Sequence, residues 1–245
     1  MKLILRIAIA CLIVMILVAC SKPSQMSTVD ELPEKAGILW SKATVIAAEN
    51  WNRVPGRSDI HLEMKDTQKQ DAINLNLTLS HTLTDSGKIS NKIINSEEAF
   101  NDLQNDLFGL LKSQIEQDRT PQNISLFHNN SPNNPLVSFT GKTKRINGYL
   151  CLGFDFEYKM SVSDSVAQKG TVWLEKKSGA PIFKESSMEV PIPMIPKLKM
   201  TETYSFVNDV WTNKEITLSA EMNILTQKVS FTMQLKQSAW WIYSP

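Results

Sequence analysis

The chain has 245 residues, a formal net charge of +1 and 42% hydrophobic residues. A nearly neutral chain lacks the excess of lysine and arginine that nucleic-acid phosphates require, so its composition argues against a nucleic-acid partner. The hydrophobic fraction suffices for a packed core. With three cysteines and three histidines, no metal site and no cofactor are expected.

The first twenty residues have the pattern of an export signal. Lys2 and Arg6 precede an unbroken apolar run over residues 7–18, which is short for a membrane span of about 20 residues. The run leads into Leu17-Val18-Ala19-Cys20, and a polar stretch follows. This segment resembles the lipobox of bacterial lipoproteins, in which small residues precede a cysteine that receives the lipid.

The lipobox resemblance implies cleavage after residue 19 and attachment of diacylglycerol to Cys20. Residues 1–19 are then a signal peptide, residues 20–28 are the lipidated cysteine with a polar tether, and residues 29–245 form one domain. In the sorting pattern of such lipoproteins, a serine at position 21 favours the periplasmic face of the outer membrane. The alternative is an uncleaved N-terminal helix that anchors the chain.

An amphipathic helix is predicted over residues 29–52. Thr28 and Glu31 have the spacing of a capping box, and Val54-Pro55-Gly56 ends the pattern. Apolar residues recur between these points at steps of three and four: Leu32, Ala36, Leu39, Ala43, Ile46 and Ala47.

The period of the pattern then changes to two, which predicts strands. Ile60, Leu62 and Met64 alternate with polar residues, and residues 73–84 alternate almost perfectly. A turn at residues 85–87 leads into a strand predicted over 88–94. Such alternation indicates an antiparallel sheet with two different faces. One face is apolar and packs on the core (the dry face), and the other is polar and meets solvent (the wet face).

A second helix is predicted over residues 96–117, inside an insertion at about 95–136. Asn95 or Ser96 would cap this helix, and its apolar stripe includes Leu103 and Leu107. A loop rich in asparagine and proline ends the insertion.

Nearly all of the chain from residue 137 onward is predicted as strand. The expected strands are 137–146, 148–162, 169–177, 181–191, 198–208, 210–223 and 227–237. About ten strands with apolar residues on one side form a sheet whose apolar face is unstable in water, and the two predicted helices are amphipathic as well. The sheet must therefore curl, and the helices must cover it.

Residues 169–206 contain a distinctive hairpin. It comprises Val172-Trp173-Leu174-Glu175, the turn Lys177-Ser178-Gly179, Ala180-Pro181 and, later, Met200-Thr201-Glu202-Thr203-Tyr204. These motifs resemble the periplasmic lipoprotein-carrier superfamily, the LolA/LolB-like half-barrels. The resemblance implies an α+β, mainly β fold: a strongly curved antiparallel half-barrel of about ten strands. The resemblance also implies that the apolar concave face, covered by the two helices, would hold acyl chains.

Three groups of residues are predicted to handle such a ligand. An apolar loop with three prolines, residues 190–196, is predicted to gate the cavity through Ile192, Met194 and Ile195. Leu103 and Leu107 belong to the helical lid. The cavity lining is predicted from dry-face positions: Leu75, Leu77, Leu79, Phe154, Phe156, Met222, Phe231 and Met233.

The polar candidates for chemistry have simpler explanations. The H-x-E motif at His61 lies on a wet strand face and lacks the cysteine pair of the deaminases. Asp155 and Glu157 are two apart on a face that is expected to point outward together with Cys151. No histidine neighbour activates that thiol. His81 lies on a dry face, where a hydrogen-bonded histidine at the rim is expected. No enzymatic activity is therefore predicted.

The sequence thus predicts a lipid-anchored periplasmic protein that binds acyl chains or the lipid part of a lipoprotein and takes part in their trafficking. Its predicted partners are the membrane, through Cys20, and the hydrophobic or acyl ligand. Another envelope protein is a further candidate partner. The alternative is a non-catalytic envelope scaffold whose core is filled by its own side chains.

Overall fold

The structure is a computed structural model that describes one helix and twelve strands. The described residues are 32–50, 52–66, 72–96, 109, 112, 115–116, 126–127, 135–159, 167–189, 197–207, 210–224 and 227–242. The elements are α2 (Glu34–Glu49), β1 (Arg53–Val54), β2 (Arg57–Asp66), β3 (Ala72–Leu83), β4 (Ile89–Ser96), β5 (Leu136–Ile146), β6 (Tyr149–Lys159), β7 (Ala167–Glu175), β8 (Pro181–Met188), β9 (Leu198–Val207), β10 (Val210–Ile224), β11 (Gln227–Ser238) and β12 (Trp241–Ile242).

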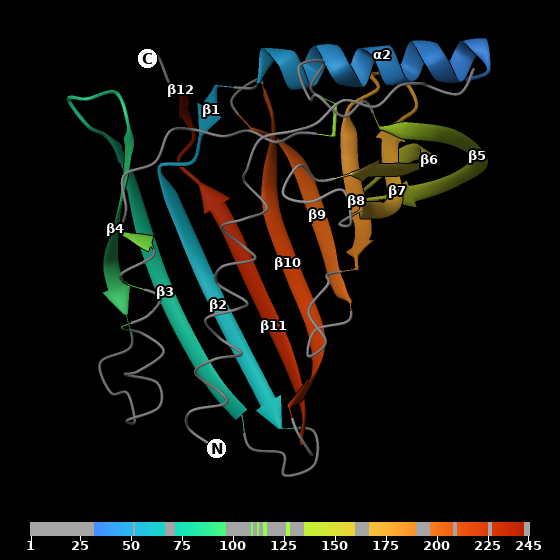
Figure 1. The fold of residues 1–245 in the computed structure, drawn as a ribbon. Helices are drawn as coiled ribbons and strands as arrows, with labels where there is room; N and C mark the ends of the chain where they lie inside the picture. The colour runs from blue at the N-terminus through green and yellow to red at the C-terminus, as the bar shows by residue number, and fades with distance from the viewer. Residues whose placement is uncertain are drawn as a thin grey trace.

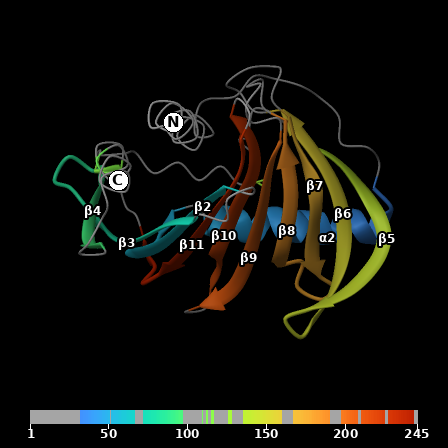
Figure 2. The ribbon, with the colours of Figure 1, turned by 90° about the horizontal axis from the view of Figure 1, so that it is seen from below.

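Ten of the strands form one antiparallel sheet in the order β4-β3-β2-β11-β10-β9-β8-β7-β6-β5. Its middle, β2 with β11 and β10, is seen face-on in Figure 1. The edge strands β4 and β5 do not pair with each other, so the sheet stays open. Seen from below, it bends into a deep arc (Figure 2). The predicted mainly β architecture is therefore confirmed, and its open, curved sheet fits a half-barrel.

The short strands β1 and β12 form a second, two-stranded sheet. Arg53 pairs with Ile242, and Val54 pairs with Trp241. Trp241 packs against the buried Val54 and Ile89. Trp241 therefore connects this short sheet to β4 through its contact with Ile89.

The predicted first helix is shorter than its sequence pattern. It begins after Pro33, which has an extended backbone, and ends at Glu49. The capping-box residues Thr28 and Glu31 lie outside the described residues. Its predicted apolar stripe does face the core, because Ala36, Leu39 and Ala43 are buried together with Trp40.

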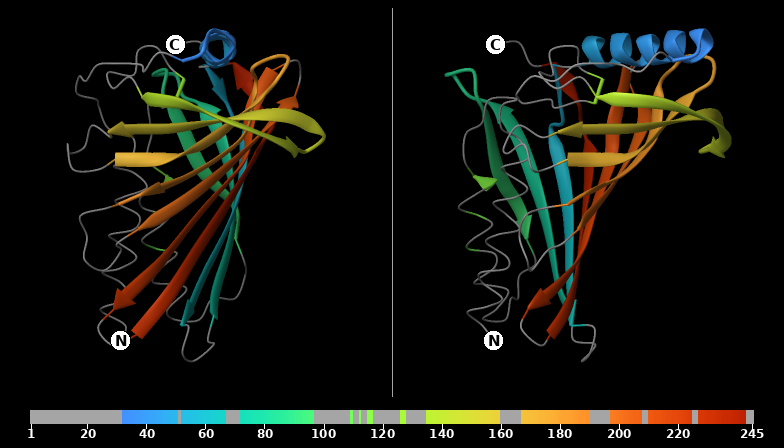
Figure 3. Two further views of the ribbon diagram at one scale, coloured as in Figure 1. Left: turned by 90° about the vertical axis from the view of Figure 1, so that its right-hand side faces the viewer. Right: turned by 45° about the vertical axis from the view of Figure 1, so that its right-hand side comes forward.

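Helix α2 lies across one end of the sheet (Figure 3). The β7–β8 turn fits against it because Gly179 has a φ of +79° and no side chain. A Cβ atom there would come within 2.6 Å of Lys42 Cβ and 2.8 Å of the Leu39 carbonyl oxygen. Lys42 Nζ also donates a hydrogen bond to the Lys177 carbonyl at 3.1 Å. The glycine turn thus positions the helix.

The predicted start of the second helix is wrong. Asn95 and Ser96 were expected to cap it, but both belong to β4, where they pair with Thr78 and Leu77. The backbone pairing with β3 therefore keeps these two residues in a strand, although their side chains could cap a helix. Gly109, Lys112 and Ile115 have helical backbone. Most of the predicted helix lies outside the described residues, and two helices covering the sheet are not confirmed.

Candidate ligand-binding face

One face of the ten-stranded sheet is apolar over most of its width, and we call it the apolar face. Paired residues of antiparallel strands point to the same side of a sheet, so the register shows which side chains share it. The central row across this face is Leu75, Leu62, Met233, Leu218, Met200, Ser186, Gly170 and Phe156. A second row is Leu77, Ile60, Leu235, Ile216, Glu202, Lys184, Val172 and Phe154.

The eight lining residues predicted on strands all lie on this face. Seven of them are buried, each with 6% or less of its surface exposed: Leu75, Leu77, Leu79, Phe154, Phe156, Met222 and Phe231. Met233 is partly exposed. The structure therefore brings together, on one surface, residues that are up to 158 positions apart in the sequence (Leu75 to Met233). That they line a ligand remains a prediction.

The other predicted site residues cannot be placed. Cys20, the lid residues Leu103 and Leu107, and the gate residues Ile192, Met194 and Ile195 lie outside the described residues.

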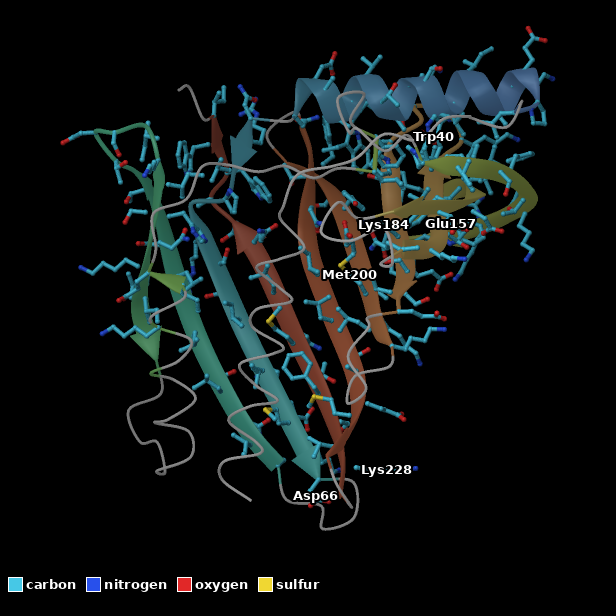
Figure 4. All side chains as sticks on the ribbon, viewed as in Figure 1. Trp40, Asp66, Glu157, Lys184, Met200 and Lys228 are labelled. Atoms are coloured by element: carbon cyan, nitrogen blue, oxygen red, sulfur yellow. The ribbon has the colours of Figure 1, made fainter. Side chains whose placement is uncertain are left out.

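Helix α2 packs onto the β5–β7 end of the apolar face. Trp40 is the main contact: its ring centroid lies 5.6 Å from that of Phe154 and 4.9 Å from that of Phe127. Figure 4 shows Trp40 between the helix and these strands. The three aromatic residues belong to one buried apolar cluster, which also includes Val172 and Leu174 of β7.

Farther along the sheet, apolar side chains on the same face retain partial exposure. They come from β2, β9, β10 and β11, and we call them the open stretch: Ile60, Met200, Ile216, Met233 and Leu235. Two of the five are methionines, whose flexible and polarisable side chains adapt to varied apolar shapes. The open stretch is the part of the apolar face on which a further apolar surface could be buried.

A polar strip crosses this face beside the open stretch. Lys184 on β8 and Glu202 on β9 form an ion pair, with 6% and 10% of their side-chain surfaces exposed. Glu202 Oε2 also accepts hydrogen bonds from the Tyr204 hydroxyl at 2.6 Å and from Asn213 Nδ2 at 3.1 Å. Lys184 and Met200, on neighbouring strands, are labelled in Figure 4.

The strip continues on β7 and β8. Gln168, which is 1% exposed, donates through Nε2 to Ser186 Oγ at 2.8 Å. We define the polar strip as Gln168, Ser186, Lys184, Glu202 and Asn213. Among its side-chain atoms, Gln168 Oε1 and Asn213 Oδ1 are buried and have no hydrogen-bond partner within the described structure.

Sequence reasoning missed this strip. Residues 181–188 read Pro-Ile-Phe-Lys-Glu-Ser-Ser-Met, in which Lys184 looks like an ordinary surface charge. The one available signal was position: Lys184 and Ser186 have the same parity as Met188, so all three share a face.

The opposite face of the sheet also carries an apolar cluster, and this corrects a prediction. The face of Asp155 was expected to point outward together with Cys151, but Cys151 is fully buried against Trp173 and Ile182. Burial raises the pKa of the Cys151 thiol to about 11, and the nearby Glu175 carboxylate adds to the shift. Such a thiol is a poor nucleophile, as was expected.

The remaining polar candidates are held by neighbouring side chains. Asp155 accepts a hydrogen bond from Thr171 Oγ1 at 2.6 Å, and Glu157 pairs with Lys169 at 3.2 Å. His61 Nδ1 lies 2.6 Å from Asn76 Oδ1 on the wet face.

His81 bridges two strands at the rim of the apolar face. Its Nε2 atom lies 2.7 Å from Ser58 Oγ, and its Nδ1 atom lies 2.7 Å from Asn91 Oδ1. Both ring nitrogens are therefore engaged, which agrees with the predicted hydrogen-bonded histidine.

The described residues contain neither a cluster of metal-binding side chains nor a helix that could span a membrane. No three of their histidine, cysteine, aspartate or glutamate side chains are grouped so that they could hold a metal ion. None of the helices found among them has the length and hydropathy of a membrane span.

No protein-family model matches the chain, and neither does any curated protein. Among solved structures, a LolA superfamily protein from Nitrosomonas europaea matches with 11% identity and a TM-score of 0.38, covering 86% of this chain and 94% of that one. An outer membrane lipoprotein-sorting protein domain from Vibrio parahaemolyticus matches with 14% identity and a TM-score of 0.37, covering 84% and 94%.

This chain is similar to LolA superfamily proteins. A DUF1329 family protein from Desulfovibrio piger is also similar to it, with 8% identity, a TM-score of 0.38 and coverage of 86% and 94%. The superfamily that the first of these structures names is the one that residues 169–206 resemble.

Proposed function

We propose that this protein is a lipid-anchored protein of the bacterial periplasm that binds hydrophobic ligands, acyl chains or the lipid part of a lipoprotein, on its apolar face. The observation that carries the proposal is the open stretch. Of the described elements, α2 covers the β5–β7 end of the face, whereas Met200 and Met233 farther along keep part of their surface exposed. Water contact with these side chains is unfavourable, and a bound hydrocarbon chain would remove it.

Binding of this kind is passive. Burying an acyl chain of about 14 methylenes releases on the order of 10 kcal/mol before the costs of ordering, at about 0.8 kcal/mol for each CH₂ group. No bond is made or broken, so neither an acid–base pair nor a cofactor is required. Transfer to a partner then depends on the difference between two affinities.

The anchor and the cover complete the proposal. Lipid on Cys20 would hold the domain at the membrane, and a tether of nine residues reaches at most about 30 Å. The serine at position 21 favours the outer membrane. Leu103 and Leu107 would form the lid, and Ile192, Met194 and Ile195 would form the gate.

A scaffold without a ligand is the second candidate, and one observation favours it. Leu75, Met222 and Phe231 are almost fully buried, as they would be in a core that the chain fills itself. Such a protein would act through surface contacts with another envelope protein.

Native mass spectrometry distinguishes the two functions. The full-length lipoprotein would be transferred from membranes into amphipol without added detergent. We expect co-purified lipid and saturable binding of a fluorescent fatty acid. An empty protein that also fails to bind the probe would reject the ligand-binding function and support the scaffold.

A pair of variants tests the location of binding. Met233→Glu places a charge on the open stretch, where a bound chain would have to desolvate it, so the probe should bind at least about tenfold more weakly. Thr232→Glu, the matched control on the wet face of the same strand, should bind normally. Equal binding by both variants would contradict the assignment of the ligand to the apolar face.

A further inference from the structure

The polar strip is built into a surface that is otherwise apolar, and it crosses four strands. Gln168 lies on β7, Ser186 and Lys184 on β8, Glu202 on β9 and Asn213 on β10. Its members lie on a diagonal across the sheet, because they occupy three successive rows of paired residues. Gln168 lies in the row of Met188, and Ser186 lies in the next row, with Met200. Lys184 and Glu202 pair with each other in the third row. Burial of polar groups is costly unless they are hydrogen-bonded, so each atom left without a partner needs an explanation.

The unpartnered atoms of the strip share one chemical property. Glu202 Oε2 can only accept, so the Asn213 amide must present its nitrogen to it and direct its oxygen elsewhere. The Asn213 oxygen and the Gln168 oxygen are both buried acceptors without partners among the described residues. A group that completes them must donate a hydrogen bond.

The strip also carries little net charge to attract an ion. The Lys184 ammonium is neutralised by the Glu202 carboxylate, and the other three members are uncharged at neutral pH. A charged headgroup would therefore have to be desolvated without finding an opposite charge there. An uncharged donor avoids this cost.

From these properties we propose that the polar strip binds the headgroup of an uncharged acyl lipid through a hydroxyl or amide N–H donor, while the chain lies on the open stretch. The proposal rests on the proposed function and specifies its ligand class. Free fatty acids, ionised at neutral pH, and simple fatty esters offer only acceptors, so they leave the Gln168 and Asn213 oxygens unpaired.

Competition binding with headgroup-matched probes tests this preference. 1-Monopalmitoylglycerol supplies hydroxyls, palmitamide supplies an amide N–H, and methyl palmitate and palmitate supply acceptors only. Each would displace a pyrene-labelled fatty ester from the full-length lipoprotein. We expect the better of the two donors to bind about tenfold more tightly than methyl palmitate, the effect of one well-formed hydrogen bond. The ranking of the two donors identifies which group is preferred.

A variant pair assigns the preference to the strip. Gln168→Met keeps the length of the side chain and removes the acceptor, so the donor preference should fall several-fold while methyl palmitate binds as before. Gln234→Met makes the same change on the wet face of β11 and should keep the full preference. Circular dichroism melts would show that both variants fold.

The outcomes separate this inference from the proposed function. If methyl palmitate binds as tightly as both donors to the unmodified protein, the headgroup inference is overturned while lipid binding stands. If no probe binds at all, the proposed function fails and the inference fails with it. The ranking needs no variant, so an unfolded Gln168→Met protein would not prevent the decision.

Discussion

Lys184 and Glu202 form an ion pair across β8 and β9 in which both side chains are nearly withdrawn from water. They face the same side as Val172 and Phe154, so the charges lie within an apolar surface. A buried pair recovers its desolvation cost only while both partners remain.

Removal of one partner should therefore be costly. Lys184→Met leaves the Glu202 carboxylate buried without a counter-charge, and we expect a loss of about 3–5 kcal/mol in the free energy of unfolding. The double variant Lys184→Met/Glu202→Leu removes both charges and should recover most of that loss. Urea unfolding followed by tryptophan fluorescence measures both. A double variant no more stable than the single one would contradict a compensated pair.

The close approach of β7 and β8 gives a second prediction. A Cβ atom on Gly170 would lie 2.0 Å from the Glu185 carbonyl oxygen and 2.7 Å from Ser186 Cα. These are backbone atoms, so Gly170→Ala must push the strands apart and should cost about 2–4 kcal/mol. Gly109→Ala, where a Cβ meets nothing within 4 Å, is the control. Equal melting temperatures of the two variants would rule out this steric account.

Alternation in the sequence was sufficient to predict the apolar face. Residues 73–84 alternate almost perfectly, and residues 216–224 and 229–235 alternate throughout, so the face of each residue follows from its parity. Burial of Leu75, Phe154 and Phe231 agrees with this. Regular pairing preserves parity, and this is why these strands were predictable.

Parity fails where the ladder is irregular. Between Trp173 and Leu174 the register of β7 and β8 shifts, and the neighbours Ile182 and Phe183 both pack with the cluster around Cys151. A bulge adds a residue to one strand without changing the alternation of the other. A bulge depends on the partner strand, so the sequence of β8 alone could not reveal that Ile182 and Phe183 both join the cluster around Cys151.

The packing of helix α2 on the sheet should depend mainly on one large side chain, Trp40. Trp40 is buried and its ring packs against that of Phe154 at a tilt of 48°, so Trp40→Ala removes the ring from the core and should lower the free energy of unfolding by about 3–5 kcal/mol. Ile38→Ala on the same helix, where the side chain is 53% exposed, should change it little. Equal losses from the two substitutions in thermal melts would show that the helix does not dock through Trp40.

The predicted anchor is tested by metabolic labelling with an alkyne analogue of palmitate. Cys20→Ala should abolish the label and release the protein from the membrane fraction, because the acyl chains supply the hydrophobic attachment. Cys11→Ala, a substitution of the same type in the apolar run, should keep both. Label that survives Cys20→Ala, or a membrane-bound unlabelled protein, would favour the uncleaved N-terminal anchor helix.

Cys151 gives a prediction that depends on pH. Alkylation requires the thiolate, and a pKa of about 11 in place of the ordinary 9.0 lowers the thiolate fraction at pH 8 about a hundredfold. Iodoacetamide should therefore modify Cys151 at least that much more slowly in the native protein than in urea, as read by mass spectrometry.

The same pKa makes stability fall in alkali. Folding favours the protonated Cys151 thiol, so its contribution is fully present below pH 9.0 and is lost as the pH rises towards about 11. Cys151→Ala, which has no titrating group, should show a smaller decrease over this interval. Rapid native alkylation at pH 8, or identical alkaline unfolding of the two proteins, would mean that the thiol is accessible and that the cluster around Trp173 does not enclose it.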